Sequence, residues 1–318
     1  TVDSTLPDVV VANSSALPTL LRAGMQLDIR FETTKALDLV GGWRPAVSLG
    51  GVTIESAQPT STTAGQEGRE FSLSHTITEL IPSTGTADPE GELVVSVELR
   101  DRAGNIVYRT LPGTVTVDRL APQLSTQVNT PVGAGAPVIY TVVTNEPLSM
   151  LDPPEVRDAG GTLVPGFFTL QGAATVGTLR FTFLRDVGQA TVDGAYTTHL
   201  RAVDRAGNET TLDGTPFTVD RTPPNVLNMV VTPGHKRLRA GVVFSVAFDV
   251  TETPAADPAV VVSPAVGGAG RAMACMRVAG SPPDLADHYV CTLTPEVLDV
   301  EGPQTVTAFV EDAAGNTG

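Results

Sequence analysis

The stretch Asp204-Arg205-Ala206-Gly207-Asn208 closes a long run of alternating residues, and it decides how the chain is divided. The same pattern occurs earlier as Asp101-Arg102-Ala103-Gly104-Asn105 and later as Asp312-Ala313-Ala314-Gly315-Asn316. The copies begin 103 and then 108 residues apart. A spacing this regular indicates a tandem array of similar domains, each large enough to hold its own core.

A second pattern, V-D-x-x-x-P, marks the joints of this array. It occurs at residues 2–7, 117–122 and 219–224. Because proline fixes φ, each copy predicts a stiffened inter-domain linker. The chain therefore begins on a linker, as though a further domain preceded it. The predicted domains span residues 1–119, 120–221 and 222–318, and the last lacks its final strand because no strand follows Asn316.

The composition excludes some classes of function. The 318 residues include 35 acidic and 20 basic side chains, which give a net charge of −15. An acidic chain repels phosphate backbones, so we expect no nucleic-acid partner. Excess carboxylates serve solubility or suit hard cations such as Ca²⁺. No apolar run reaches the ~18 residues that a membrane span requires, so we expect no membrane insertion by this segment.

Period-two alternation of apolar residues recurs in each repeat and predicts half-buried strands. It is clearest at Leu27, Ile29 and Phe31; at Val138, Tyr140 and Val142; and at Phe244, Val246 and Phe248. Further predicted strands lie at Ala46–Leu49, Val52–Glu55, Glu70–Thr78, Glu155–Arg157, Leu163–Val164, Thr178–Leu184, Ala259–Val262, Arg271–Val278 and His288–Leu293. About seven short strands per hundred residues, without helical periodicity, favour an all-β fold of three tandem immunoglobulin-like β-sandwiches in an extended array.

Together these patterns resemble the bacterial immunoglobulin-like repeat domains found in tandem in large surface proteins and adhesins. In that family a strand ending D-x-A-G-N is followed by a strand ending T-V-D-x-x-x-P, as at Asp204–Asn208 and Thr218–Pro224. The resemblance implies a non-catalytic structural or adhesive role at the cell surface. It covers the whole chain and says little about the particular task.

The D-x-A-G-N turn has a purely structural interpretation. Its Asp side chain can cap the turn, and its Gly supplies a positive φ. A metal hypothesis stands beside it, because in a sandwich of this type the linker, the end of the second strand and this turn meet at one pole. The residues that would converge are Asp118, Glu146, Asp204 and Asn208 at one joint, and Asp220, Glu252, Asp312 and Asn316 at the next. Carboxylate and amide oxygens are ligands for Ca²⁺.

Two features oppose a metal at these joints. Arginines follow the acids at Arg102, Arg119, Arg205 and Arg221, and a carboxylate–arginine network would satisfy the same charges. In the first repeat, Lys35 stands where the glutamate would be needed. Asp3, Lys35 and Asp101 therefore predict a salt bridge rather than an ion site.

The two cysteines, Cys275 and Cys291, flank a turn-rich segment centred on residue 283. A hairpin centred there would place them directly opposite each other, close enough for a disulfide. The alternative is two small buried residues. A disulfide favours an extracellular, cell-surface or periplasmic setting.

Catalysis finds little support in the sequence. The histidines (His75, His199, His235 and His288) are scattered, and no nucleophile, zinc or phosphate motif is present. We expect no enzyme, but a stalk or spacer that contacts other domains of a longer chain. The alternative is an accessory module of a secreted enzyme or receptor that binds glycan or protein through Trp43 or through Phe167 and Phe168. Burial of Trp43 is the favoured interpretation.

Overall fold

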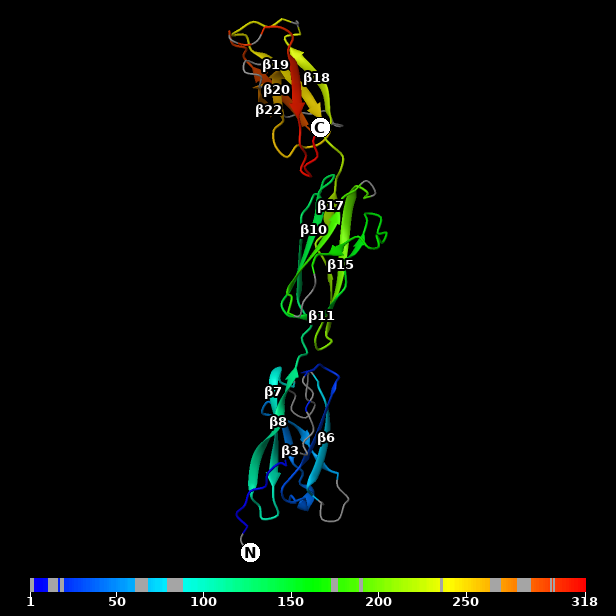
Figure 1. Ribbon diagram of the computed structural model, residues 1–318, viewed down its shortest axis with the longest axis vertical. Helices are drawn as coiled ribbons and strands as arrows, with labels where there is room; N and C mark the ends of the chain where they lie inside the picture. The colour runs from blue at the N-terminus through cyan, green and yellow to red at the C-terminus, as the bar shows by residue number, and fades with distance from the viewer. Residues whose placement is uncertain are drawn as a thin grey trace. The chain divides into compact units, whose positions relative to one another are not determined.

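The computed structural model shows a chain built almost entirely of β-strands (Figure 1). It describes residues 3–10, 17, 20–60, 68–78, 88–172, 177–188, 191–234, 237–263, 270–278, 287–297, 299 and 301–318. The 3₁₀ turn η2 (Val40–Gly42) is the helical element within these ranges. None of the described helical segments is long and apolar enough to cross a membrane.

The strands that lie before residue 118 form two sheets. One has the order β1-β8-β7-β3-β4, with β1 at Leu20–Leu21, β8 at Ile106–Val117, β7 at Gly91–Arg100, β3 at Ala46–Leu49 and β4 at Val52–Ser56. The other has the order β2-β6-β5, with β2 at Gln26–Glu32, β6 at Glu70–Thr76 and β5 at Gln58–Pro59. This division of the strands between sheets is that of an immunoglobulin-like sandwich.

A second pair of sheets lies between residues 124 and 219. The order β13-β14-β10-β9 uses Thr169–Leu170, Arg180–Asp186, Pro137–Thr144 and Leu124–Val128. In the facing sheet the central strand is β15 (Gly194–Asp204), which pairs with β11 (Leu148–Leu151), β12 (Glu155–Arg157), β16 (Glu209–Asp213) and β17 (Phe217–Val219). The predicted strand at Leu163–Val164 is wrong, because Leu163 forms only an isolated bridge with Arg157.

In the third pair, the four-stranded sheet repeats the order of its counterpart in the second pair. One sheet has the order β18-β19-β23-β22, from Val226–Thr232, Phe244–Val250, Asp287–Leu293 and Ala274–Val278. The other has the order β21-β20-β24, from Arg271–Ala272, Ala259–Ser263 and Thr305–Phe309. Where β8 and β16–β17 lie in the earlier pairs, the described residues make only the start of a strand: Glu311 bridges Thr317, and Gly318 N donates to Val310 O at 2.9 Å.

Each sandwich encloses its own apolar core, to which the alternating residues contribute. In the first, Leu27, Ile29 and Phe31 are buried, and Phe31 stacks on Phe71 with ring centroids 5.3 Å apart. The second core contains a cluster of aromatic rings in which the centroids of contacting pairs lie 5.0 to 6.5 Å apart: Tyr140, Phe167, Phe168, Phe183, Tyr196 and Phe217. In the third, Phe248 stacks on Tyr289.

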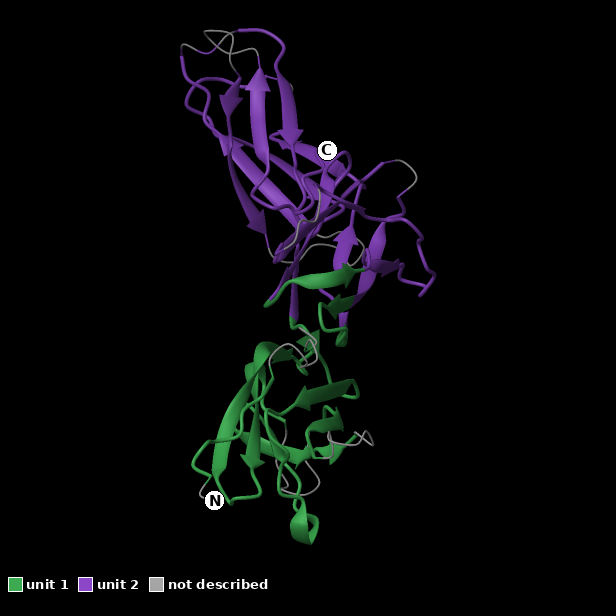
Figure 2. Cartoon of the chain, turned by 60° about the horizontal axis from the view of Figure 1, so that its bottom comes forward, with its two compact units in different colours: residues 1–123, 145–151, 202–210 green, residues 124–144, 152–201, 211–318 purple. Residues whose placement is uncertain are grey.

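The packing of the chain defines two compact units, which cut across the predicted domains (Figure 2). One contains residues 1–123, 145–151 and 202–210, and the other contains residues 124–144, 152–201 and 211–318. The segments around Glu146 and Asp204 group with the linker that carries Asp118, because these three segments contact one another. The predicted domain boundaries stay a prediction.

Candidate metal centres

The three D-x-A-G-N turns have similar hydrogen bonds, with the aspartate at the centre of each. Asp204 Oδ1 accepts the backbone N–H groups of Gly207 (2.7 Å) and Asn208 (2.9 Å). Asp312 and Asp101 also accept the N–H of their turn asparagine, but their second bond comes from the N–H of Ala314 and of Ala103, not from the glycine. Gly207 has φ of 94°, a backbone conformation that favours glycine. The structural interpretation of the turn is therefore correct.

The asparagine of each turn ties the turn to the preceding linker. Asn208 Nδ2 donates to Asp118 O at 2.9 Å and to Asp204 Oδ2 at 2.8 Å. Asn316 Nδ2 makes the same two bonds, to Asp220 O and Asp312 Oδ2, both at 2.8 Å. The Asn316 amide oxygen accepts the N–H of Ala134 at 3.0 Å. The sequence predicts oxygen ligands from these amides, but it is their nitrogen atoms that face the turn carboxylates. They act as clamps.

Two acidic triads lie beside these clamps. Asp118, Glu146 and Asp204 each place a carboxylate oxygen within 4.8 Å of the other two, and so do Asp220, Glu252 and Asp312. Calcium–oxygen distances of about 2.3–2.6 Å put opposite ligands roughly 4.6–5.2 Å apart, so one Ca²⁺ fits between these oxygens. The shorter Mg²⁺–oxygen distance, about 2.0–2.1 Å, fits this spread less well.

Electrostatic strain is visible in both triads. Burial raises the pKa of Glu146, and the negative charges of Asp118 and Asp204 raise it further. Burial and the charge of Asp204 likewise raise the pKa of Asp118. In the second triad, burial and the charges of Asp220 and Asp312 raise the pKa of Glu252. A bound cation would oppose all three shifts, because it favours the charged carboxylate.

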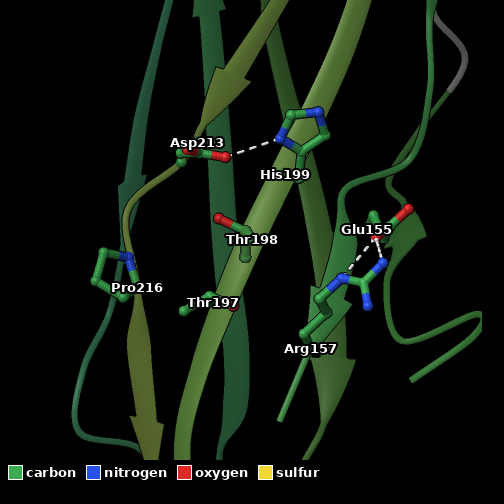
Figure 3. Close-up of a pocket in the computed structure, with 8 residues that line it drawn as sticks. Glu155, Arg157, Thr197, Thr198, His199, Asp213 and Pro216 are labelled. Carbon is green, nitrogen blue, oxygen red and sulfur yellow. Dashed lines mark hydrogen bonds and ion pairs between the residues drawn. The ribbon is translucent and has the colours of Figure 1, made fainter. Parts of the chain in front are cut away.

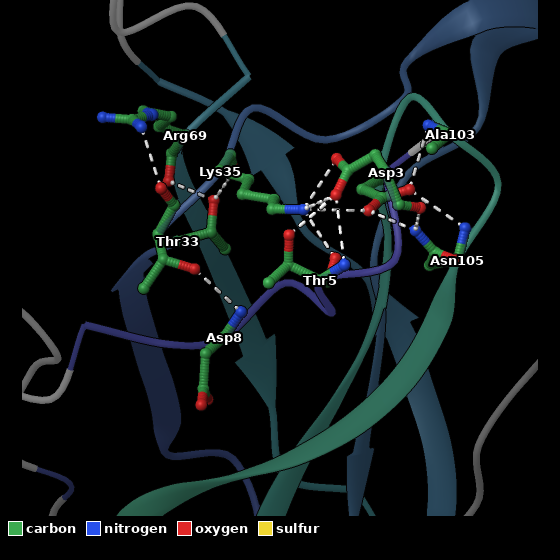
Figure 4. A network of polar contacts seen from close by, with 10 residues as sticks. Asp3, Thr5, Asp8, Thr33, Lys35, Arg69, Ala103 and Asn105 are labelled. Atoms are coloured by element: carbon green, nitrogen blue, oxygen red, sulfur yellow. Dashed lines mark hydrogen bonds and ion pairs between the residues drawn. The ribbon is translucent and has the colours of Figure 1, made fainter. Parts of the chain in front are cut away.

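The first joint has a lysine at the corresponding place (Figure 4). Lys35 Nζ lies 2.8 Å from Asp3 Oδ2 and 3.5 Å from Asp101 Oδ2. The hydrogen bond from Lys35 lowers the pKa of Asp3 to about 2. Hydrogen bonds, led by that from Asn105, lower the pKa of Asp101. The predicted salt-bridge site is present, and its ammonium group supplies the positive charge.

The arginines next to the linker acids bind other carboxylates. Arg119 Nε lies 2.9 Å from Glu90 Oε2, and Arg221 Nε lies 2.6 Å from Asp193 Oδ1. These ion pairs anchor each linker to the preceding sandwich. The alternative hypothesis, in which Arg102, Arg119, Arg205 and Arg221 neutralise the acids of the joints, stays a hypothesis, although these two ion pairs join arginines to carboxylates outside the triads.

One contact beside each acidic joint was not foreseen from the sequence. A Cβ atom on Gly207 would lie 3.1 Å from Arg22 Nε, and one on Gly133 would lie only 2.4 Å from Ala314 O. The loops that carry Arg22 and Gly133 thus touch the D-x-A-G-N turn beside them. The sequence offered one indication of this contact, Gly133, because a glycine outside a turn motif can mark a place where another backbone segment approaches closely.

An open groove of about 580 Å³ lies on the outer face of β15 (Figure 3). His199 Nδ1 lies 2.8 Å from Asp213 Oδ1, and Arg157 lies 2.7 Å from Glu155. Thr198 points to the interior instead, where its hydroxyl lies 2.8 Å from Tyr140 Oη. Neighbouring strand residues face opposite sides, so Thr198 and His199 do not form a nucleophile–base pair.

The aromatic residues considered for partner binding lie mainly inside the protein. Phe167 and Phe168 are 3% and 6% exposed, so the suggestion that they form a recognition loop is wrong. Trp43 is half-buried against the first core, with the Arg100 guanidinium carbon 4.8 Å from its ring centroid. The sequence favours burial of Trp43, and the structure shows that this burial is partial.

The predicted disulfide is present. Cys275 and Cys291 are paired residues of β22 and β23, and their sulfur atoms are bonded. The hairpin residues between these strands, including the predicted turn at 280–284, lie outside the described residues.

No family model matches the sequence, and no curated protein matches it. Solved structures do. Fibronectin(III)-like modules of CbhA from Clostridium thermocellum are 13% identical, cover 67% of this chain and 92% of their own, and have a TM-score of 0.24. The ectodomain (Ig1–Ig3) of mouse nectin-like molecule 4 is 12% identical over 92% of this chain and 95% of its own, with a TM-score of 0.31.

The major pilin subunit BcpA of Bacillus cereus is 10% identical over 86% of each chain, with a TM-score of 0.19. At TM-scores this low, the strand order of the sheets establishes the fold, and the likeness to any one of these proteins adds nothing to it.

Proposed function

We propose that this chain is a non-catalytic structural region of an extracellular protein, a stalk or spacer, and that Ca²⁺ binds at its two acidic joints. The observation that carries the proposal is that the same joint occurs three times, with a lysine between the acids in one copy and a glutamate in the other two. Asp3 and Asp101 surround the ammonium of Lys35, whereas the equivalent acids of the other joints surround Glu146 and Glu252. A divalent cation would take the place that the lysine ammonium has in the first joint.

The calcium ion would act on the joint and not on a substrate. Asp118 comes from the linker, Glu146 from the segment before β11, and Asp204 from the end of β15. An ion held by all three would cross-link these segments and relieve the repulsion between their carboxylates. The clamps Asn208 and Asn316 already hold the linkers, so the ion would stiffen a preformed joint.

The setting follows from the disulfide and the composition. The Cys275–Cys291 bond favours an oxidising compartment, which supports an extracellular or cell-surface location. The net charge of −15 suits a spacer that is well solvated. A spacer of this kind contributes reach and stiffness, while recognition lies in other parts of the parent protein.

Isothermal titration calorimetry with CaCl₂ on the chelator-treated chain tests the proposal. We expect two calcium ions per chain, with a rise in melting temperature that chelator reverses. Glu146→Gln and Glu252→Gln should each remove one site, while Glu155→Gln, on an exposed acid outside the triads, should leave both. An absence of calcium heat, together with an unchanged melting temperature, would contradict the metal proposal. The spacer role would then rest on the clamps alone.

A further inference from the structure

The outer face of the sheet β18-β19-β23-β22 is apolar and exposed. Strand register arranges its residues in three rows. The central row consists of Val230, Ala247, Val290 and Met276. Val230 and Met276, at the two ends of this row, are 56% and 64% exposed. Four apolar side chains therefore cross the whole sheet on the side away from the core.

The flanking rows add no free charge to this face. One row consists of Thr232, Ser245, Thr292 and Ala274, and the other of Leu227, Asp249, His288 and Val278. Asp249 Oδ1 lies 2.6 Å from His288 Nδ1, and Asp249 Oδ2 accepts a 2.8 Å hydrogen bond from Asn228. The two ionisable groups of the face thus bond to each other.

The fold does not require an apolar surface here, as the equivalent faces of the other sandwiches show. In the first sandwich the outward residues of β2 and β6 are all polar: Gln26, Asp28, Arg30, Glu32, Glu70, Ser72, Ser74 and Thr76. In the second, the outward pair Ile139 and Leu184 is apolar, but Arg180 and Asp186 place charges on the same outer side of β14. Among the described rows of the three faces, a row of four apolar residues flanked by no unpaired charge occurs on the third alone, and an exposed apolar face of this kind marks an interaction surface.

We infer that this face is a self-association surface, and that its occupant is the same face of a second copy of the chain. A partner for it must be flat and uncharged, since the face offers no charge to complement a charged partner. Among the three equivalent faces of the chain, this face itself meets that requirement. Two copies related by a two-fold axis bury it without bringing like charges together.

The area of the face sets the strength of the dimer. Four strands spaced about 4.8 Å apart and three rows of side chains give a face of roughly 400 Å², or roughly 800 Å² for the pair. This is below the range of stable interfaces, so the dimer is weak and transient, with Kd on the order of 100 μM. The acidic remainder of each chain repels its copy, and added salt therefore tightens the association.

Sedimentation equilibrium of the whole chain over a concentration series tests the inference. Chelator is present throughout, which makes the result independent of calcium at the joints. We expect a monomer–dimer equilibrium that Val230→Lys weakens at least about tenfold, as does Met276→Lys on the opposite edge of the sheet. Ser74→Lys, on the equivalent face of the first sandwich, is the matched control and should leave Kd unchanged.

A mixture of the Val230→Lys and Val230→Glu variants should associate more tightly than either variant alone, because the two faces then carry opposite charges. Circular dichroism melts establish that each variant is folded, and the two edges provide independent variants if one fails to fold. A wild-type chain that is monomeric at every concentration overturns the inference. So does a dimer that neither lysine substitution weakens, or binding of this face to neutral lipid vesicles by a chain that stays monomeric.

Discussion

The asparagine of the D-x-A-G-N turn holds each joint together through its side-chain amide, and Asn316 uses both the nitrogen and the oxygen of that amide. Asn316 is 7% exposed and bonds to the carbonyl oxygen of Asp220, to the Asp312 carboxylate and to the N–H of Ala134. Asn105 makes the equivalent donor bonds to Asp3 O and Asp101 Oδ2. The two positions therefore differ in burial and in the bond that the amide oxygen makes.

We expect Asn316→Ala to destabilise the protein by about 1–3 kcal/mol, because it leaves buried polar groups without partners. Asn105→Ala, at a more exposed joint, should cost less and serves as the matched control. Urea denaturation followed by fluorescence measures both. Equal losses in the two variants would show that burial of the clamp is not what gives it strength.

Raised carboxylate pKa values predict a pH dependence of the calcium-free protein. Because the pKa of Glu146 and of Glu252 is raised above 4.5 in the folded state, that state holds its protons more tightly than the unfolded chain. Stability should therefore increase as the pH falls from 7 through these raised values towards 4.5. The lowered pKa of Asp3 acts in the opposite direction, and only at lower pH.

Melting temperatures measured with chelator between pH 7 and pH 5 test this dependence. The double variant Glu146→Gln, Glu252→Gln should show a flatter profile than the wild type, and added calcium should flatten the wild-type profile. A wild-type profile that rises with pH over this interval would contradict the repulsion between the triad acids.

At the scale of the strand, β16 and β17 show how one glycine shapes an element. A Cβ atom on Gly214, between these strands, would lie 2.0 Å from Tyr140 Oη and 2.6 Å from Thr198 Oγ1. We expect Gly214→Ala to destabilise the chain by about 1–3 kcal/mol through overpacking. Gly188→Ala is the control, since a Cβ atom added there would have no heavy atom within 4 Å and the φ of Gly188 is not positive. Thermal denaturation of the two variants distinguishes these outcomes.

The disulfide ties the edge strand β22 to β23, and the cysteines are 16 residues apart in sequence. Replacing both with alanine should cost about 3 kcal/mol, the loop-closure value for such a spacing. The loss should be local, so hydrogen exchange of the amides of β22 should accelerate more than exchange in β2 and β6. Uniform acceleration across all three strands would contradict a local role.

Some strands could be predicted from the sequence to the residue, and others could not. Ala46–Leu49 and Glu155–Arg157 match β3 and β12, since turn residues bound both. The strand β11 at Leu148–Leu151 was missed, because it lacks alternation and its burial is irregular. Its pairing with β15 depends on tertiary contacts that no local pattern records.

The candidate site divides in the same way. The sequence repeats and the expected sandwich topology were enough to predict which six acids form the two triads, because strand ends at the same pole of a sandwich lie close together. The role of Asn208 and Asn316 could not be predicted, since an amide offers both a donor and an acceptor and only the position of the linker selects between them.

Across the whole molecule, three copies of one joint form an internal comparison. We expect Lys35→Glu to convert the first joint into a third acidic triad with Asp3 and Asp101, and to raise the calcium stoichiometry from two towards three. Lys35→Gln is the control and should add no ion, because it removes the positive charge without adding a carboxylate. Calorimetry of the two variants measures the number of sites. An unchanged stoichiometry in Lys35→Glu would show that three acids at this pole are not sufficient.

The clamps also impose an order on the biogenesis of the chain. Asn208 bonds to a linker carbonyl 90 residues before it, and Asn316 bonds to one 96 residues before it. If the chain is synthesised or exported from its N-terminus, the clamp on each linker can therefore form only after nearly all of the following sandwich has emerged. Closure of a joint is thus a late, long-range event that reports completion of the next sandwich. Until then the acids of the linker stay exposed to solvent.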